Sequence, residues 1–182
     1  HLHKTNEWEL HIIDIDETRR ETVKAKLDPD CHFHVANVND YSQLATAFDH
    51  AFSEGCRLNF VFANAGIVER TDFYSRHPAE RPPPPLDQFS IDIDLKSVVN
   101  TAYLALHYFR QSPPNEPKHL ITTGSIGCLY PCFGLPMYTS AKRKKIDPLC
   151  TVPLDELSSN CSDGVLGFTR AIADRFFKEG IR

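Results

Sequence analysis

Short apolar runs alternate along the chain with longer segments in which apolar residues recur every three or four positions. The first pattern predicts strands and the second predicts amphipathic helices. Strands are expected at residues 9–15, 31–35, 58–63 and 119–123. Helices are expected at residues 41–52, 89–110, 136–142 and 164–179. The uninterrupted apolar run at residues 58–63 is typical of a strand that is buried on both faces.

Residues at the ends of these segments support the same boundaries. Asp40 is suited to be the N-cap of the helix at residues 41–52, and Gly55 is expected to end it. Pro136 is suited to open its helix, and Gly180 to close the last one. Residues 16–27 are charged and compatible with a further helix, whereas residues 68–87 are polar, contain four consecutive prolines and predict a loop.

Strands that alternate with helices predict parallel β-α-β units and an α/β, Rossmann-like, doubly wound sheet in one domain. In such sheets ligands bind outside the carboxyl ends of the strands. Asp14 lies at the end of a predicted strand, and Asn64 and Ser125 follow two others, so the three are expected to gather along one edge of the sheet.

Composition excludes several classes of function. The 182 residues suffice for one domain with a sizeable core, the net charge is −4, and no basic block indicates nucleic-acid binding. No apolar run approaches the roughly 18 residues of a membrane helix, and residues 1–10 lack the apolar core of a signal peptide. The six cysteines include no CxxC pair, which indicates reduced thiols in a cytoplasmic protein.

Four of the nine histidines form two H-x-H pairs, His1/His3 and His32/His34. An H-x-H pair on a strand can chelate a metal ion, but no acidic residue or cysteine lies at ligand spacing along the sequence. No metal site is therefore predicted.

Three residues form a candidate for proton chemistry. Ser125 follows an apolar strand, Tyr138 lies thirteen residues further on, and Lys142 is four residues after Tyr138. Residues four apart on a helix share one face, so the phenol and the ammonium would be neighbours. A nearby cation favours the phenolate and makes a tyrosine a usable general acid/base. Spacing alone equally fits a surface lysine, a half-buried tyrosine and a loop serine.

Four segments carry a resemblance to a known family: FANAGI at 62–67, TTGSIG at 122–127, YTSAK at 138–142 and VLGFTRAIA at 165–173. Together and in this order they resemble the short-chain dehydrogenase/reductase family, and within it fungal members similar to NAD-dependent hydroxyprostaglandin dehydrogenase. A lone YxxxK or NAG is weak as a signal, but all three motifs on the expected elements are specific.

The resemblance implies a role for each residue of the trio. Tyr138 would be the general acid/base, Lys142 would favour the phenolate and hydrogen-bond the nicotinamide ribose, and Ser125 would orient the substrate oxygen. The implied activity is hydride transfer between NAD(P) and a small secondary alcohol or ketone. The alternatives are a non-catalytic remnant or pseudoenzyme and, with less support, an epimerase or lyase on the same scaffold.

The resemblance also implies a cofactor site. Asp14 would accept hydrogen bonds from the adenosine ribose and repel a 2′-phosphate, which favours NAD over NADP. Asn64, Ala65 and Gly66 would line the adenosine side of the cofactor. The alternatives are a helix N-cap for Asp14, a role that Asp16 can fill instead, and a tight turn for the other three. The family often pairs through the helices at 89–110 and 165–179, and the oligomeric state stays open.

The chain departs from the family pattern at its ends. The glycine-rich cofactor loop and the strand before it, which would lie centrally in the sheet, have no counterpart in this sequence. The strands at residues 9–15 and 58–63 are therefore expected to lack the partner between them, and the family's later strands would follow residue 182. The predicted sheet is accordingly incomplete, lacking the first β-α unit and the C-terminal strands.

Two substitutions and one insertion are further departures. Asp94 occupies the position of the family's active-site asparagine, where a charge would either accept a hydrogen bond or disfavour the phenolate of Tyr138. Asn37 replaces an aspartate near the adenine. Residues 143–163 interrupt the helix of Tyr138 and Lys142, and are interpreted as a retained intron or gene-model error, with a lineage-specific surface loop as the alternative.

Overall fold

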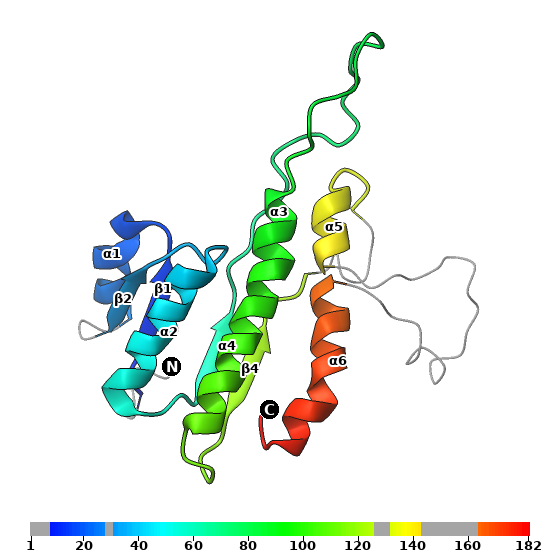
Figure 1. Cartoon of the computed structure of the whole chain (residues 1–182). Coiled ribbons are helices and arrows are strands. Elements are labelled where there is room, and N and C mark those ends of the chain that lie inside the picture. The colour runs from blue at the N-terminus through cyan, green and yellow to red at the C-terminus, as the bar shows by residue number, and fades with distance from the viewer. Residues whose placement is uncertain (1–7, 28–30, 126–131, 143–163) are drawn as a thin grey trace.

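The computed structural model describes residues 8–27, 31–125, 132–142 and 164–182 and confirms an α/β chain (Figure 1). The strands are β1 (His11–Asp14), β2 (His32–Val35), β3 (Phe60–Ala63) and β4 (His119–Thr122). The main helices are α1 (Arg20–Lys26), α2 (Tyr41–Gly55), α4 (Ser97–Gln111), α5 (Pro136–Lys142) and α6 (Gly164–Lys178). The predicted insertion at residues 143–163 lies outside the described residues.

The described strands form two parallel pairs, which confirms the predicted parallel sheet class. β1 pairs with β2, with His11 opposite His32, and β3 pairs with β4, with Phe62 opposite Ile121. Within the described ranges no backbone pairing joins β1 to β3. This agrees with the expectation that these two strands lack a partner between them.

The free edge of β4 is met by the last residues of the chain. Ile181 forms a parallel bridge with Lys118, the Arg182 amide donates to the Lys118 carbonyl at 2.7 Å, and the Leu120 amide donates to the Arg182 carbonyl at 2.7 Å. Gly180 takes the positive φ of 75° that lets the chain turn back from α6 to β4. The glycine predicted to close the last helix therefore also starts a new pairing.

The ends of α2 show how local sequence sets a helix. The Asp40 carboxylate accepts hydrogen bonds from the Ser42 and Gln43 amides, as expected of an N-cap. At the other end Gly55 is still helical, and Cys56 takes the left-handed conformation at φ 51°. Gly55 is therefore the last helical residue, which confirms the predicted end of this helix.

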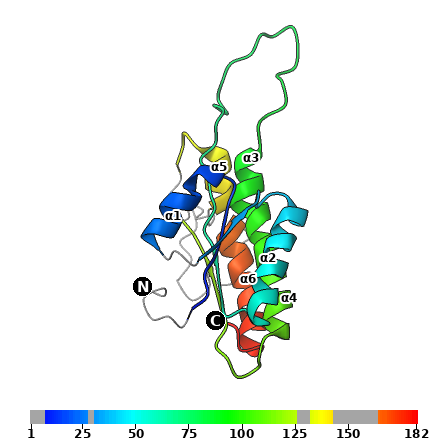
Figure 2. The same ribbon diagram turned by 90° about the vertical axis from the view of Figure 1, so that its left-hand side faces the viewer.

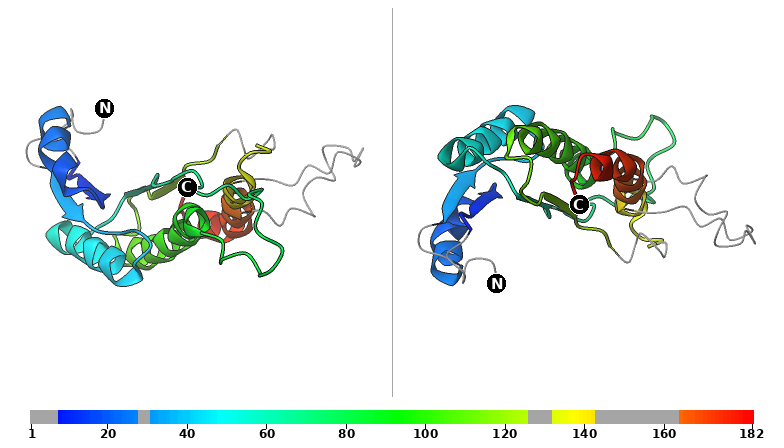
Figure 3. Two further views of the ribbon diagram at one scale, coloured as in Figure 1. Left: turned by 90° about the horizontal axis from the view of Figure 1, so that it is seen from above. Right: turned by 90° about the horizontal axis from the view of Figure 1, so that it is seen from below.

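Helices α2, α4 and α6 form a layer on one face of the strands, as the side and end views show (Figures 2 and 3). The main hydrophobic core lies between this layer and the strands. Its buried members include side chains of α2, β3, α4 and α6: Leu44, Phe48, Val61, Leu104, Phe109 and Phe176. The shorter α1 lies on the other side of the first strand pair, where Arg20 stacks on Phe33.

The expectation that residues 58–63 are buried on both faces is wrong. Val61 and Ala63 are buried, but Phe62 is 53% exposed and its register partner Ile121 is 46% exposed. Alternate side chains of a strand point to opposite faces, and α2, α4 and α6 all cover the face of Val61. The other face of the β3–β4 pair is therefore open among the described residues.

The predicted helix at residues 89–110 exists but is not uniform. It begins as α3 (Phe89–Ile91), widens into a π-helical turn, η3 (Asp92–Lys96), and continues as α4. The Ser97 hydroxyl bonds the Ile93 carbonyl where the turn ends. π-turns inside helices are frequent at functional sites. This one carries Asp94, which is fully buried.

The loop predicted at residues 68–87 is present, extends to residue 88 and projects beyond the helices (Figure 1). At its base Arg70 contacts the Asp87 carboxylate at 3.0 Å and stacks over the Phe89 ring at 4.4 Å. In the part of the chain that the structure describes, no helix is long and apolar enough to cross a membrane.

Candidate active site

Lys142 is held at the end of β4 by a backbone carbonyl and a carboxylate. It is the last residue of α5, its side chain is 4% exposed, and its ammonium donates to the Thr123 carbonyl at 3.3 Å. Ser125 lies two residues after Thr123 on the loop that leaves β4, and is partly buried. Tyr138 lies one turn before Lys142 on α5 and is also partly buried. The fold thus brings the helix of Tyr138 and Lys142 to the strand end that carries Ser125.

Asp94 joins Lys142 to the turn that follows β3. Its Oδ1 accepts a hydrogen bond from the Ile67 amide at 2.9 Å and lies 3.8 Å from the Lys142 Nζ. A Cβ on Gly66 would come within 2.9 Å of the same oxygen and 3.5 Å of the Lys142 Nζ. The glycine of the Asn-Ala-Gly turn is therefore needed for the close approach of these groups.

The charge on Asp94 is poorly solvated. Burial raises the pKa of Asp94, and this effect outweighs the opposing contributions of the Ile67 amide and the Lys142 ammonium. Its Oδ2 is buried and has no hydrogen-bond partner among the described residues. The Asp94–Lys142 pair is thus a buried contact in which desolvation is only partly compensated.

The Asn-Ala-Gly turn is tied to the loop after β4. The Thr123 hydroxyl donates to the Asn64 Oδ1 at 2.7 Å, and the Thr123 amide donates to the Ala63 carbonyl at 3.0 Å. Asn64, Ala65 and Gly66 are exposed at this edge. They therefore form a tight turn whose surface is also open to a ligand, so both sequence interpretations remain compatible.

Glu69 is a site residue that sequence reasoning missed. Its carboxylate accepts a hydrogen bond from the Tyr138 amide at 2.8 Å, and its second oxygen is buried without a partner among the described residues. A carboxylate next to the first turn of a helix accepts a hydrogen bond from an otherwise unpaired amide, and its negative charge is attracted by the positive end of the helix dipole. Glu69 therefore positions the start of α5, and nothing in its sequence surroundings marks it for that role.

Asp14 is the last residue of β1, and Asn37 lies two residues after the neighbouring strand β2. Asp14 accepts a hydrogen bond from the Asp16 amide at 2.9 Å and lies 3.5 Å from Arg19, whereas Asn37 accepts from the Asn39 amide at 3.0 Å. Asp16, and not Asp14, caps the following 3₁₀ turn, η2 (Glu17–Arg19), by accepting from the Thr18 amide. The N-cap alternative for Asp14 is therefore not realised.

A second group of polar side chains lies at the opposite ends of the same strands. Glu9 approaches both His11 and His32, and His11 contacts His34. Burial and the neighbouring His32 lower the pKa of His11, whereas Glu9 acts in the opposite direction. Burial and His11 lower the pKa of His34. Sequence spacing singled out the H-x-H pair but showed no acidic partner; the E-x-H at residues 9–11, on the adjacent strand, was the available signal.

Comparison with known proteins assigns the family. The model of the short chain dehydrogenase family matches residues 3–146. The chain belongs to this family. The resemblance seen in the sequence motifs is thereby confirmed, and the parallel α/β fold is the one expected of a short-chain dehydrogenase.

Two curated short-chain dehydrogenases illustrate the range of similarity. A short-chain dehydrogenase/reductase of Penicillium rubens, prx7, is 45% identical and covers 97% of this chain. The NAD⁺-dependent 15-hydroxyprostaglandin dehydrogenase of Rattus norvegicus is 25% identical over 82% of the chain. This short-chain dehydrogenase chain spans 57% of the length of the first and 44% of the second.

A solved structure supports the fold independently of sequence. ElxO with NADP bound superposes with a TM-score of 0.70 at 16% identity. The match covers 98% of this chain and 62% of that protein. At this identity the likeness concerns the fold, which agrees with the Rossmann-like architecture predicted from the strand and helix pattern.

Proposed function

We propose that the whole protein is an NAD(P)-dependent oxidoreductase that interconverts a small secondary alcohol and a ketone. The observation that carries the proposal is the placement of Lys142. Its buried ammonium contacts the Thr123 carbonyl two residues before Ser125, and it lies one helical turn from Tyr138. Family membership supports the same chemistry.

The chain's own residues would handle the proton and hold the substrate. During oxidation Tyr138 takes the proton from the alcohol hydroxyl, and during reduction it returns a proton to the carbonyl oxygen. The Ser125 hydroxyl orients that oxygen beside the phenol. The Lys142 ammonium places a positive charge one helical turn from Tyr138. When bound, the nicotinamide accepts or supplies the hydride.

Asp94 acts on this chemistry through Lys142. The carboxylate lies 3.8 Å from the ammonium and anchors the Ile67 amide, so it positions the lysine against the Asn-Ala-Gly turn. A charged Asp94 would also partly offset the cation that assists Tyr138. We therefore assign Asp94 as a positioning residue, whereas the family pattern has an asparagine in its place.

NAD is the cofactor that the adenosine end of the chain fits better. Asp14 is the last residue of β1, a position where a carboxylate accepts hydrogen bonds from ribose hydroxyls. An arginine near this position would favour the 2′-phosphate of NADP. The nearby arginine, Arg19, is already paired with carboxylates, at 3.5 Å from Asp14 and 3.3 Å from Asp16. The two carboxylates leave this corner negative, which disfavours a phosphate. The exposed Asn64, Ala65 and Gly66, and Asn37 after β2, would complete the cofactor surface.

The second candidate is a non-catalytic member of the family with a binding or scaffold role. The observation that favours it is Asp94, which places a buried carboxylate 3.8 Å from the Lys142 ammonium where the family pattern has an asparagine. For the 182-residue chain alone we expect weak or no NAD binding by calorimetry. Micromolar binding would contradict that expectation.

Pairing of two chains through α4 and α6 and a cytoplasmic location stay predictions.

The test compares catalysis by two tyrosine variants. The protein assayed is this chain extended by a glycine-rich first β-α unit and by C-terminal strands, with residues 143–163 deleted. NADH formation is measured with a panel of secondary alcohols. Tyr138→Phe is expected to lower kcat by at least about 10²-fold, the lower range for loss of a general acid/base. Tyr103→Phe is the matched control, because Tyr103 is 66% exposed on α4. Full turnover by Tyr138→Phe would refute the assignment, and no turnover by any form would favour the non-catalytic candidate.

A further inference from the structure

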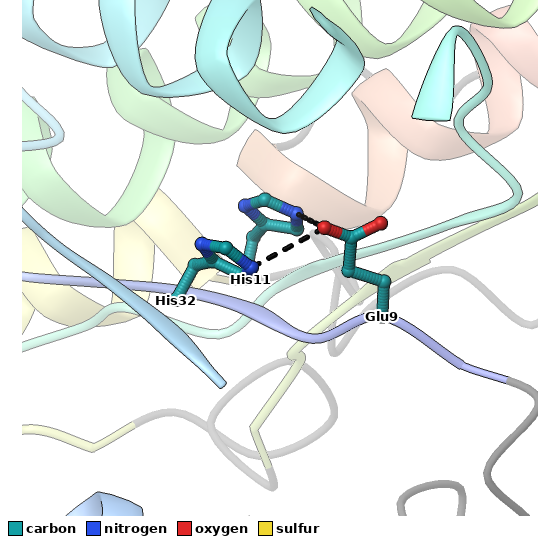
Figure 4. Close-up of side chains that lie close together, drawn as sticks. All are labelled: Glu9, His11 and His32. Carbon is teal, nitrogen blue, oxygen red and sulfur yellow. Dashed lines mark ion pairs between the residues drawn. The ribbon is translucent and has the colours of Figure 1, made fainter. Parts of the chain in front are cut away.

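Three side chains converge at the amino ends of β1 and β2, away from the candidate active site (Figure 4). His11 and His32 are the first residues of the two strands and are direct partners in the parallel register. Glu9 precedes His11 by two residues, so it shares a side with His11 in an extended chain. Asp14 and Asn37, the cofactor candidates, lie at the carboxyl ends of the same strands.

The separations of the donor atoms suit one small cation. The Glu9 Oε1 lies 3.5 Å from the His11 Nε2 and 3.2 Å from the His32 Nε2, and all three ligand atoms lie within 4.8 Å of one another. Zinc bonds of about 2.0–2.1 Å in a tetrahedral site place neighbouring donors ~3.3 Å apart. The two distances to Glu9 lie on either side of that value.

His11 also has the supporting contact that metal-binding histidines commonly have. Its Nδ1 lies 3.0 Å from the His34 Nε2, which fixes the plane of the ring, and its other nitrogen is thereby directed towards Glu9. That Nε2 is buried and has no hydrogen-bond partner among the described residues. In metal sites a second group bonded to the distal nitrogen orients the ligating imidazole in the same way.

The His32 ring supplies the adjustment that coordination requires. The His11 and His32 rings are stacked at 4.6 Å and nearly parallel, with an angle of 11° between their planes. The nitrogen lone pairs of the two rings therefore point in parallel directions, and one ring must turn before both nitrogens can coordinate the same ion. His11 is held by His34, whereas the His32 side chain is 39% exposed, so His32 is the ring that would turn.

We propose that Glu9, His11 and His32 bind a divalent transition-metal ion of the zinc type, with a fourth position open to water. Two imidazole nitrogens and one carboxylate oxygen form a donor set that such ions accept. Glu9 and His11 belong to the β1 side and His32 to β2, so the ion ties the two strands together where they begin. This site is separate from the proposed dehydrogenase chemistry and does not depend on it.

The test is calorimetric titration of the metal-free 182-residue chain with zinc chloride. One ion per chain is expected. Glu9→Gln and His32→Gln should each weaken zinc binding by at least about tenfold, because loss of a group that only supports a ligand already costs about that much affinity. Both side chains are partly exposed, so the variants keep the core. His107→Gln is the matched control, because His107 is exposed on α4.

Two further measurements separate this site from adventitious binding. Cobalt(II) bound at the site should give visible d–d absorption without a thiolate charge-transfer band, since the donors are nitrogen and oxygen. Zinc should also raise the Tm of the wild-type chain but not of His32→Gln. The proposal is overturned by no saturable binding, by unchanged affinity in both variants, or by a thiolate band that assigns the ion to the cysteines. The last two outcomes show that the ion binds elsewhere on the chain.

Discussion

Asp94 is a buried carboxylate that meets one amide, one ammonium and no third partner among the described residues. Its raised pKa means that the folded state binds the proton more tightly than the unfolded state does. Between the unfolded and the folded pKa, stability therefore falls as pH rises, and the loss is complete above the folded value. The charge at this position costs stability at neutral pH.

Asp94→Asn should therefore raise the Tm at pH 7, because the amide keeps an acceptor for Ile67 without a buried charge. The gain should shrink as pH falls through the folded pKa of Asp94, which thermal melts from pH 7 to pH 4 would follow. Asp92→Asn on the same turn is the control, because the Asp92 side chain is 41% exposed. Asp94→Ala should be less stable than Asp94→Asn by about 1–3 kcal/mol, since the Ile67 amide loses its acceptor. A lower Tm for Asp94→Asn at pH 7 would show that the pairing with Lys142 outweighs desolvation.

The sequence identified Asp94, Tyr138 and Lys142, but not how they contact their surroundings. Tyr138 and Lys142 are four residues apart on one helix, so their proximity follows from local geometry. Asp94 meets Ile67 and Lys142 only after distant segments pack, and the same holds for Glu69 and the Tyr138 amide. Motif spacing carries no information about such contacts, which is why Glu69 had no signal.

Helix α6 is fastened to α4 by one carboxylate. Glu179 accepts two hydrogen bonds from Arg110 at 2.7 and 2.8 Å and one from Arg175 at 2.7 Å. These bonds, that from Arg110 foremost, lower the pKa of Glu179 to about 2. A lowered folded pKa means that the stabilisation is present above the unfolded value of 4.5 and is lost as pH falls towards about 2.

Glu179→Gln should lower the Tm modestly at pH 7, because a surface pair is screened by water. The difference from the wild-type chain should close as pH falls from about 4.5 to about 2, and should narrow in high salt. Asp174→Asn is the matched control: its pair with Lys178 lies within α6 and its side chain is 79% exposed. An equal loss in both variants would indicate a general charge effect on α6 rather than a clamp between helices.

Element boundaries were predictable where local chemistry decides them. Asp40 caps α2 because its carboxylate reaches two amides of the same turn, which needs no tertiary contact. The π-helical turn at Asp92–Lys96 was not predictable, since apolar spacing over six turns favours a uniform helix. Apolar character also does not decide burial on α4, since Tyr103 is 66% exposed while Leu104 and Ala105 are buried.

The core of the molecule is one cluster shared by elements that are distant in sequence. Phe109 on α4 is 1% exposed and belongs to this cluster, together with side chains of α2, β3 and α6. Phe109→Ala should lower the free energy of unfolding by about 3–5 kcal/mol. Phe177→Ala on α6, where Phe177 is 72% exposed, should change it by no more than about 0.5 kcal/mol. Urea unfolding of both variants measures the difference, and similar losses would mean that the cluster is not the main source of stability.

The arrangement of layers was predictable only in part. Alternating strands and helices indicated parallel pairing, and both pairs are parallel. Burial of residues 58–63 on both faces was inferred from their apolar character, which reports a tendency to be buried but not which segment covers each face. Phe62 and Ile121 remain open because the three long helices lie together on the opposite face of the strands.

The projecting loop divides the chain into halves that meet mainly through the core. Leu44, Phe48 and Val61 precede the loop, and Leu104, Phe109 and Phe176 follow it. Glu69 and the Arg70–Asp87 contact hold the base of the loop, so its outer residues, including the exposed Arg76, are not needed to bring the halves together. A tryptic nick at Arg76 should therefore leave two fragments that elute as one particle. Expressed separately, the same fragments should reassemble, which makes this loop a site for split-protein complementation.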